Sequence, residues 1–501
     1  MSARHFDVLI IGAGLSGVGA AAHLRRQSPG KSFALIERRQ SIGGTWDLFR
    51  YPGIRSDSDM FTLGYSFKPW KEEKSIASGG SILNYIKETA SEYRLDNHIH
   101  YGQKVVSLDW SSPEATWTVI TESESDGSQD IFTCNYLMGC TGYYNYDAGY
   151  TPAFPGAENF KGQVVHPQKW SDDIDYGNKK VLIIGSGATA VTLVPAMAEH
   201  AAHVTMLQRS PSYVATVPEK DVISIRLRKF LPENVVYQMA RVRNVGLQRT
   251  VYKLSKQRPK IVRKALLAMA SKQLGADFDM KHFSPKYNPW EERLCAVPNG
   301  DLFKVLKEGK ASVITDAIDT FTSNGILLKS GKTIEADIIV TATGLDLQML
   351  GGITPTVDGV QKNISESMIY KGAMLSGLPN MTMIFGYTNS SWTLKADMVS
   401  EFTCRLLNYM DKNSIRYCVP EAHQDDIADS PFLDLQSGYV ARSADKLPRQ
   451  GKSAPWKVVQ DYFSDIPVLK FSQINDEGLR FVGGREQKNK GVFNTLLSTF
   501  S

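Results

Sequence analysis

The order of apolar and polar positions predicts a parallel β-sheet at the start of the chain. Residues 6–11 are mostly apolar, as in a short strand that is covered on both faces. Residues 18–26 then read as a helix, and residues 33–37 form a second short apolar run. A strand, a helix and another strand in this order predict a βαβ unit with two parallel strands.

The turn between the first strand and its helix carries glycines at fixed spacing, in the sequence Gly12-Ala-Gly14-Leu-Ser-Gly17. Such glycines permit a tight turn and let backbone N–H groups approach a phosphate at the N-terminus of the helix. The second strand ends at Glu37, whose carboxylate can accept a hydrogen bond from a ribose hydroxyl. Together these features predict a dinucleotide site, whereas the alternative is an ordinary tight turn.

A second copy of this pattern lies near the middle of the chain. Its apolar run, glycine turn and second strand are residues 181–184, Gly185-Ser-Gly187-Ala188-Thr189 and 204–208. Here Arg209 takes the place of Glu37. A carboxylate would repel a ribose 2′-phosphate, whereas a guanidinium can pair with it. We therefore expect FAD at the first site and NADPH, in preference to NADH, at the second, unless Arg209 is a solvated surface charge.

Residues 43–57 are rich in glycine, proline and aromatic side chains, which is typical of irregular backbone packed closely against another group. The segment contains Gly44, Thr45, Trp46 and Asp57. Because it follows the first nucleotide site, we expect it to lie over a flat aromatic cofactor. The alternative is a well-ordered loop whose aromatic residues are structural.

The rest of the pattern predicts an α/β protein with two Rossmann-like dinucleotide-binding domains. A first crossing between them is expected at 143–156, and the apolar strand at 337–344 is expected to lead back. This gives an FAD-binding domain in two parts, 1–155 and 337–501, and an NADP-binding domain at 156–336. Further predicted elements are a helix at 82–93, antiparallel strands at 105–110 and 116–121, a hairpin around Ser330-Gly331 and a helix at 395–409.

Residues 220–281 differ from the rest of the chain, because they contain 15 Lys or Arg and 4 Asp or Glu. Apolar residues occur among them at helical spacing, namely Val242, Val245, Leu247, Val251, Leu254 and Ile261. The pattern predicts a basic amphipathic helical insertion, over roughly 220–300, in the second domain. Three interpretations stay open: a solvated helical face, contact with a membrane surface, and contact with nucleic acid, for which no recognised module is present.

Composition narrows the class of protein. The chain has 501 residues, of which 42% are hydrophobic and 22% charged, as in a globular protein of two or three domains. Its five cysteines form no C-x-x-C pair, so we expect no disulfide framework, no metal site and a reduced, cytoplasmic setting. We also expect neither a membrane-spanning helix nor a signal peptide. The net charge of +5 is too small to indicate a nucleic-acid-binding protein.

The pattern Phe160-x-Gly162-x-x-x-His166-x-x-x-Trp170 stands directly before the second glycine turn. Together with the Gly-Thr-Trp and Tyr-Pro-Gly segments of residues 43–57, it resembles the fingerprint of the Baeyer–Villiger monooxygenases, which are class B flavin-dependent monooxygenases. The resemblance covers almost the full length. It implies FAD and NADPH as cofactors, O₂ as co-substrate, and oxygen insertion beside the carbonyl of an aliphatic, long-chain ketone. One departure is Glu292, where better-known members carry Lys.

The resemblance also implies roles for three side chains. The oxygen that attacks a ketone carries negative charge, and an anion in a dry site needs a fixed positive charge nearby. Arg293 would supply it, since a guanidinium keeps its proton, and Asp57 would hold Arg293 in place. His166, at the domain crossing, would couple domain motion to NADP binding, unless it is a structural histidine.

Other functions stay open at this level. A flavin monooxygenase that oxidises sulfur or nitrogen, as in thioethers and thioamides, can share the same site. A disulfide reductase with two nucleotides is disfavoured, because the sequence has no redox-active cysteine pair. A redox sensor or membrane-docking module without turnover would consume NADPH independently of any organic substrate.

Overall fold

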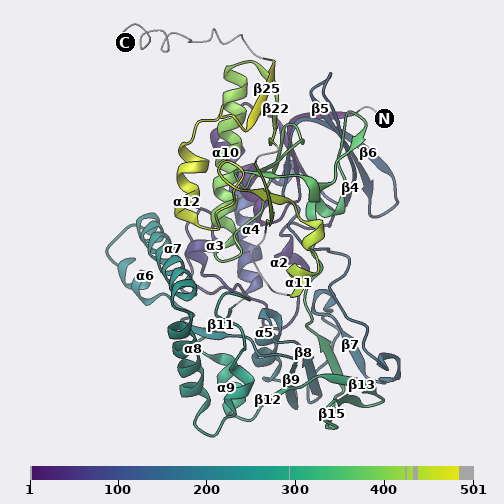
Figure 1. Cartoon of the computed structure of the whole chain (residues 1–501), viewed down its shortest axis with the longest axis vertical. Helices are drawn as coiled ribbons and strands as arrows, with labels where there is room; N and C mark the ends of the chain where they lie inside the picture. The colour runs from purple at the N-terminus through teal and green to yellow at the C-terminus, as the bar shows by residue number, and fades with distance from the viewer. Residues whose placement is uncertain (1–2, 293, 424–425, 433–437, 484–501) are drawn as a thin grey trace, which may run out of the picture.

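The computed structural model describes residues 3–292, 294–423, 426–432 and 438–483. The chain forms two lobes, each built on a β-sheet, stacked along the longest axis of the molecule. A group of helices projects from one side between them (Figure 1).

The first sheet is centred on β1 (Arg4–Ile11). This strand lies parallel to β2 (Phe33–Ile36) on one side and to β6 (Gln129–Gly139) on the other, and α1 (Leu15–Gln27) joins β1 to β2. The predicted βαβ unit is therefore confirmed. The strand order is β18-β17-β4-β5-β6-β1-β2-β3, with β3 (Ile99–His100), β4 (Gln103–Ser111), β5 (Thr116–Ser123), β17 (Thr356–Val357) and β18 (Val360–Gln361).

The C-terminal part of the chain completes this first lobe. The first half of β6 pairs antiparallel with β5, and its second half pairs parallel with β21 (Met381–Met383). α10 (Trp392–Lys412) and α4 (Gly79–Glu92) pack against α1. The predicted helices at 82–93 and 395–409 and the antiparallel strands at 105–121 are thus confirmed.

The second sheet has five parallel strands in the order β12-β9-β8-β16-β7. Helix α5 (Ala188–Met197) joins β8 to β9, and α9 (Asp301–Lys307) packs against α5. The fold class, α/β with two Rossmann-like domains, is confirmed. The five strands are β7 (Gln163–Val165), β8 (Lys180–Ile184), β9 (His203–Gln208), β12 (Ala311–Thr315) and β16 (Ile338–Thr341).

The position of β16 corrects one predicted boundary. The strand was expected to open the second part of the FAD-binding domain at residue 337, but it pairs with β8 and β7 in the second sheet. A short apolar strand carries no local signal of the sheet that it joins, because its partners are distant in sequence. The chain returns to the first lobe only after Thr341.

The two crossings between the lobes run side by side. The N–H of Asn145 donates to the carbonyl of Asp346 (2.8 Å), and the N–H of Gln348 donates to the carbonyl of Tyr143 (3.0 Å). Tyr150 donates in the same way to Gly344 (3.1 Å). The outgoing and returning segments therefore form one hydrogen-bonded connection.

The predicted helical insertion is present as α6 (Val222–Leu227), α7 (Glu233–Gln257) and α8 (Pro259–Leu274). It leaves the second lobe after β10 (Val214–Val217) and returns through β11 (Cys295–Pro298), and these two strands pair with each other. The predicted hairpin is also confirmed. Its strands and the remaining short elements are β13 (Ile318–Thr322), β14 (Gly325–Leu328), β15 (Thr333–Glu335), β19 (Ile369–Tyr370), β20 (Met374–Leu375), β22 (Ile415–Pro420), β23 (Ile427–Pro431), β24 (Arg449–Gly451), β25 (Leu479–Gly483), α2 (Thr45–Leu48), α3 (Met60–Leu63), α11 (Gly438–Ala441) and α12 (Tyr462–Ile466).

Although α7 belongs to the insertion of the second domain, it is anchored to the first lobe. The buried guanidinium of Arg241 donates to the carbonyls of Phe61 (3.0 Å) and Gly64 (2.7 Å) and to the carboxylate of Asp397 on α10 (3.2 Å). Asp397 also contacts His23 on α1 (3.2 Å). Removing one partner of such a buried pair leaves an uncompensated charge, so these contacts hold α7 firmly against the first lobe.

The apolar residues of the insertion have the expected helical spacing, but most of them face outward rather than toward the core. Of the six apolar residues named above, only Val245 is buried, and the other five are exposed. Helical spacing predicts that residues share a face, but it does not say whether that face meets the core. Within the described ranges, no helix is both long enough and apolar enough to cross a membrane.

Candidate active site

The turn after β1 is so tight that only glycine fits at two of its positions. Gly12 has a φ of +103°, and a Cβ at Gly17 would overlap the carbonyl oxygen of Gly12. α1 begins directly after Gly14, and no side chain of the described residues caps the start of this helix. The N-terminus of α1 therefore presents N–H donors that suit a phosphate.

Glu37 lies directly after β2 and supports this turn. Its buried carboxylate accepts hydrogen bonds from the N–H groups of Ala13 (2.7 Å) and Arg39 (2.9 Å). Burial raises the pKa of the Glu37 carboxyl, and the two hydrogen bonds offset only part of this effect. Because a carboxylate oxygen accepts more than one hydrogen bond, Glu37 keeps capacity for a ribose hydroxyl in the cavity of about 110 Å³ that it lines with Gly12.

A larger cavity, of about 270 Å³, lies where the two lobes meet. Its walls include the N-terminal ends of both α1 and α5, so the two predicted nucleotide sites open into one space. The predicted site residues that line it are Gly14, Gly44, Thr45, Trp46, Asp57, Ala188 and Thr189. The loop at 43–57 therefore lies beside both glycine turns, as its predicted position over a flat cofactor requires.

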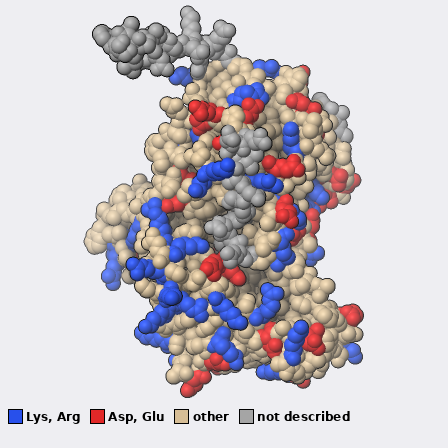
Figure 2. Space-filling model, in the orientation of Figure 1, with Lys and Arg blue, Asp and Glu red and all other residues tan. Residues whose placement is uncertain are grey.

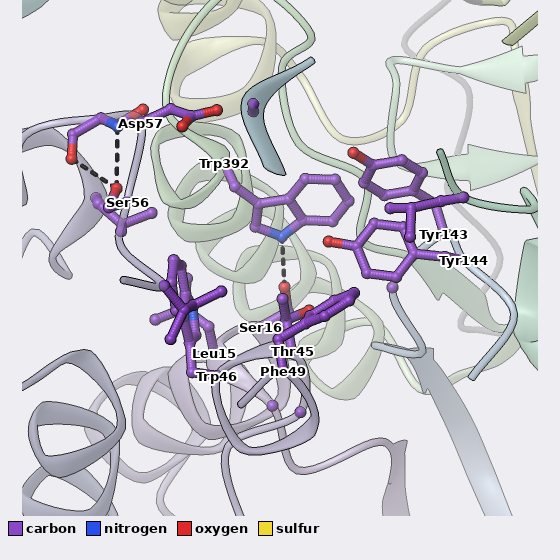
Figure 3. Close-up of a pocket in the computed structure, with 18 of the residues that line it drawn as sticks. Leu15, Ser16, Thr45, Trp46, Phe49, Ser56, Asp57, Tyr143, Tyr144 and Trp392 are labelled. Atoms are coloured by element: carbon purple, nitrogen blue, oxygen red, sulfur yellow. Dashed lines mark hydrogen bonds between the residues drawn. The ribbon is translucent and has the colours of Figure 1, made fainter. Parts of the chain in front are cut away.

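One wall of this cavity is aromatic and was not predicted from the sequence. The indole N–H of Trp392 donates to Ser16 Oγ (2.7 Å), and its ring stacks on Tyr143 with centroids 5.2 Å apart. In Figure 3, Trp392 stands between the Ser56–Asp57 segment and the rings of Tyr143 and Tyr144. The Asn-Ser-Ser-Trp sequence at the start of α10 was the only available signal, and it gave no role.

Tyr51 links the loop at 43–57 to the second nucleotide site. Burial and the negative charge of Asp57 raise the pKa of the Tyr51 hydroxyl, while a hydrogen bond with Thr189 opposes this change. Tyr51 therefore keeps its proton over the physiological range. The contact places Asp57 of the first lobe and Thr189 of α5 within reach of the same side chain.

The second glycine turn leaves open space beside Gly187. Gly187 precedes α5, and its φ of −81° is open to any residue. A Cβ at this position would meet nothing within 4 Å among the described residues. Neither backbone strain nor packing requires glycine here, and the open space beside it would let a pyrophosphate approach the backbone closely. In contrast, Gly185 has a φ of +138°, and a Cβ there would overlap the carbonyl of Ala342.

Replacing Gly187 with alanine is therefore expected to leave folding intact and to raise the KM for NADPH by roughly tenfold, since the added methyl keeps the phosphate away from the N-terminus of α5. Steady-state kinetics and thermal unfolding on one preparation measure both effects. The Gly185→Ala variant is the control, and it is expected to lower the Tm. An unchanged KM in a folded Gly187→Ala protein would remove this turn from the pyrophosphate site.

Arg209 follows β9 and is exposed, close enough to Glu292 to act on its titration. Burial raises the pKa of the Glu292 carboxyl, and the positive charge of Arg209 partly offsets the rise. Glu292 departs from the family pattern. Its carboxylate therefore lies near Arg209, the candidate partner of the 2′-phosphate. This neighbour was not predicted from the sequence.

His166 lies outside the lining of both cavities. Its Nε2 lies 3.3 Å from the carbonyl oxygen of Gly344, and the N–H of Gln168 donates to its Nδ1 (3.2 Å). This pattern fits the neutral ring with its proton on Nε2, and burial lowers the pKa of His166. His166 thus contacts the returning crossing, where its predicted part in domain coupling would act. Arg293 lies outside the described residues.

Comparisons with known proteins agree with this geometry. The family described as flavin-binding monooxygenase-like matches residues 6–388. The FAD-containing monooxygenase EthA of Mycobacterium tuberculosis (strain ATCC 25618 / H37Rv) is 53% identical over 480 residues, which are 95% of this chain and 98% of EthA. Among solved structures, oxidized steroid monooxygenase bound to NADP has a TM-score of 0.75 at 20% identity, covering 96% of this chain and all of that one. Open cyclohexanone monooxygenase has a TM-score of 0.74 at 18% identity, with the same coverage.

The two solved structures share the fold at low identity, whereas the family match and EthA extend over most of the chain. Two glycine turns that open into one cavity are the arrangement expected for electron transfer between two nucleotides. We conclude that this chain belongs to the flavin-binding monooxygenase-like family.

Proposed function

We propose that this monooxygenase uses NADPH and O₂ to insert an oxygen atom beside the carbonyl of an aliphatic, long-chain ketone. The observation that carries the proposal is the cavity that borders both α1 and α5 and has Asp57 in its wall. The family fingerprint around His166 supports the same reaction, and the chain shares its fold with cyclohexanone monooxygenase, which is named for a ketone.

The two glycine turns would hold the cofactors. EthA, a relative of this chain, is named as FAD-containing, and the steroid monooxygenase structure is bound to NADP. When bound, FAD would supply the redox chemistry that takes a hydride from NADPH and activates O₂. The chain would bind the FAD pyrophosphate at Gly12, Gly14 and Gly17 and its ribose at Glu37, with Gly44, Thr45 and Trp46 along the flavin. It would bind NADPH at Gly185, Gly187, Ala188, Thr189 and Arg209.

Arg293 and Asp57 would provide the charge for the oxygenation. A fixed guanidinium stabilises the negative charge that develops on the attacking oxygen, and Trp392 and Tyr143 line the cavity in which this would occur. Asp57 would orient Arg293 and compensate its charge before O₂ reacts. His166 would link NADP binding to the movement of the lobes through its contact with Gly344.

A third cavity is large enough for an elongated substrate. It has a volume of about 570 Å³ and shares Thr388 and Ser390 with the cavity of about 270 Å³. Its other walls come from α7, through Val245 and Tyr252, and from residues 457–462. Because substrate pockets commonly measure roughly 300–1,000 Å³, a chain that extends from the flavin side into this space fits the proposed class of ketone.

Product analysis tests the proposed reaction. Purified protein is incubated with NADPH, O₂ and straight-chain ketones and thioethers of matched chain lengths. The ester is expected from the ketones, with one atom of labelled O₂ in each ester, and none without NADPH. Sulfoxide without any ester would favour the alternative, a monooxygenase of sulfur or nitrogen. NADPH consumption that does not respond to any organic substrate would favour a sensor without turnover.

A further inference from the structure

The outer surface of the helical insertion is unusually apolar. In the described part of the chain, 18 large hydrophobic residues are exposed, and 12 of them lie between Val222 and Met269. Phe230 is the most exposed, at 83%. A soluble protein rarely gathers exposed apolar side chains in one region without a partner. We call the surface of these 12 residues, which lie on α6, α7, α8 and the connection between α6 and α7, the insertion face.

The apolar residues of α7 follow the helix in two ordered sets. Val235, Met239 and Val242 are spaced i, i+4, i+7, and so are Leu247, Val251 and Leu254. Each set therefore lies on one side of the helix, and the second set is turned by about a third of a turn from the first. Together they form a broad apolar stripe that points away from the anchoring contacts of Arg241.

Positive charges predominate around the insertion face. Residues 234–276 contain ten Lys or Arg and no Asp or Glu. Arg258, Lys260 and Lys264 are exposed and form no ion pair within the described ranges. Figure 2 shows Lys and Arg gathered where α7 and α8 lie in Figure 1. Exposed apolar side chains within a field of positive charge are the features by which a helix binds an anionic membrane surface.

We propose that the insertion face docks on the surface of an anionic lipid bilayer. A second copy of the chain is a poorer occupant, because a two-fold contact would bring two such basic surfaces together. The side chains of α7 that face inward, such as Val245 and Gln248, line the 570 Å³ cavity. Docking would therefore place that cavity one helix away from the lipid. This last consequence rests on the proposed oxidation of long-chain ketones, whereas docking itself does not.

Vesicle flotation with the full-length protein tests the proposal. Binding is expected to vesicles of phosphatidylglycerol and phosphatidylcholine and not to phosphatidylcholine alone, and it should weaken between about 50 mM and about 500 mM salt, because the charges are screened. Phe230→Ser should weaken binding by roughly tenfold. Phe471→Ser is its matched control, because Phe471 is exposed to a similar degree, at 76%, outside the insertion face.

Charge reversal supplies an independent pair of variants. Lys260→Glu with Lys264→Glu should reduce binding by roughly tenfold or more. Lys329→Glu with Lys332→Glu makes the same change on two exposed lysines near the β14–β15 hairpin and should have little effect.

Absence of binding at low salt, or equal binding by variants and controls, would overturn the proposal. So would a Phe230→Ser protein that binds vesicles normally but changes its oligomeric mass, because the insertion face would then join two copies. Flotation requires no turnover, so failure of the proposed oxidation would leave this result unaffected.

Discussion

Replacing Arg293 with alanine is expected to reduce product formation by about 100-fold or more while FAD stays bound, since this is the usual cost of losing a fixed donor at a developing anion. The substitution leaves both glycine turns and the buried Glu37 unchanged. FAD affinity should therefore stay near that of the parent protein. The defect should appear in the oxygenation half of the reaction.

Two measurements on the same preparation separate the halves of the reaction. Anaerobic reduction by NADPH, followed at the flavin absorbance, should slow less than aerobic ketone conversion. Arg293→Lys keeps a positive charge without the planar fork and should recover only part of the activity. Asp57→Asn should also reduce ketone conversion, because Arg293 would lose the carboxylate that orients it. A near-normal ester yield from Arg293→Ala would mean that another group stabilises the anion.

Replacing Arg209 with alanine is expected to raise the KM for NADPH by roughly 10–100-fold and to leave the KM for NADH nearly unchanged. Loss of one charge-assisted contact costs about 1.5–3 kcal/mol, and only NADPH carries the 2′-phosphate. Because Arg209 is exposed and follows β9, its removal should not disturb the second sheet. Steady-state kinetics with both nucleotides measure the ratio of the KM for NADPH to the KM for NADH directly.

Glu292→Gln is the matched control for this prediction, because it removes the negative charge beside Arg209. It should lower the KM for NADPH by a few fold, in the direction opposite to Arg209→Ala. Since burial raises the pKa of Glu292, acidification should neutralise the carboxyl and improve NADPH binding in the parent protein but less in Glu292→Gln. Equal effects of Arg209→Ala on both nucleotides would place this residue away from the phosphate.

The sequence predicted those features that depend on near neighbours. Both glycine turns and their helices follow from a few adjacent residues, and the structure has them as α1 and α5. The sheet of β16 was assigned wrongly, because its partners β7 and β8 lie more than 150 residues before it and its own residues do not encode the choice. Trp392 was missed for a similar reason, since its contact with Ser16 joins opposite ends of the chain.

Periodicity also could not predict which side of the insertion helices faces the core. Leu247 and Val251 have the spacing of a buried face, yet both are exposed. α7 instead buries the side that carries Tyr237, Arg241 and Val245, and the hydrogen bonds of Arg241 join this side to the first lobe. A lone arginine within a basic segment gives no sign of this in the sequence.

The anchoring of α7 also bears on which elements can move together when the two lobes move. α7 is fixed to the first lobe through Arg241, whereas α8 packs against α9 of the second lobe, so the insertion is divided between the two lobes. Four connections therefore link the lobes, namely the two hydrogen-bonded crossings at Asn145 and Asp346, the segment from β10 to α6, and the turn from α7 to α8. A movement of the second sheet is therefore expected to carry α8 with it, to bend the chain at the turn between α7 and α8, and to change the contact between Tyr51 and Thr189.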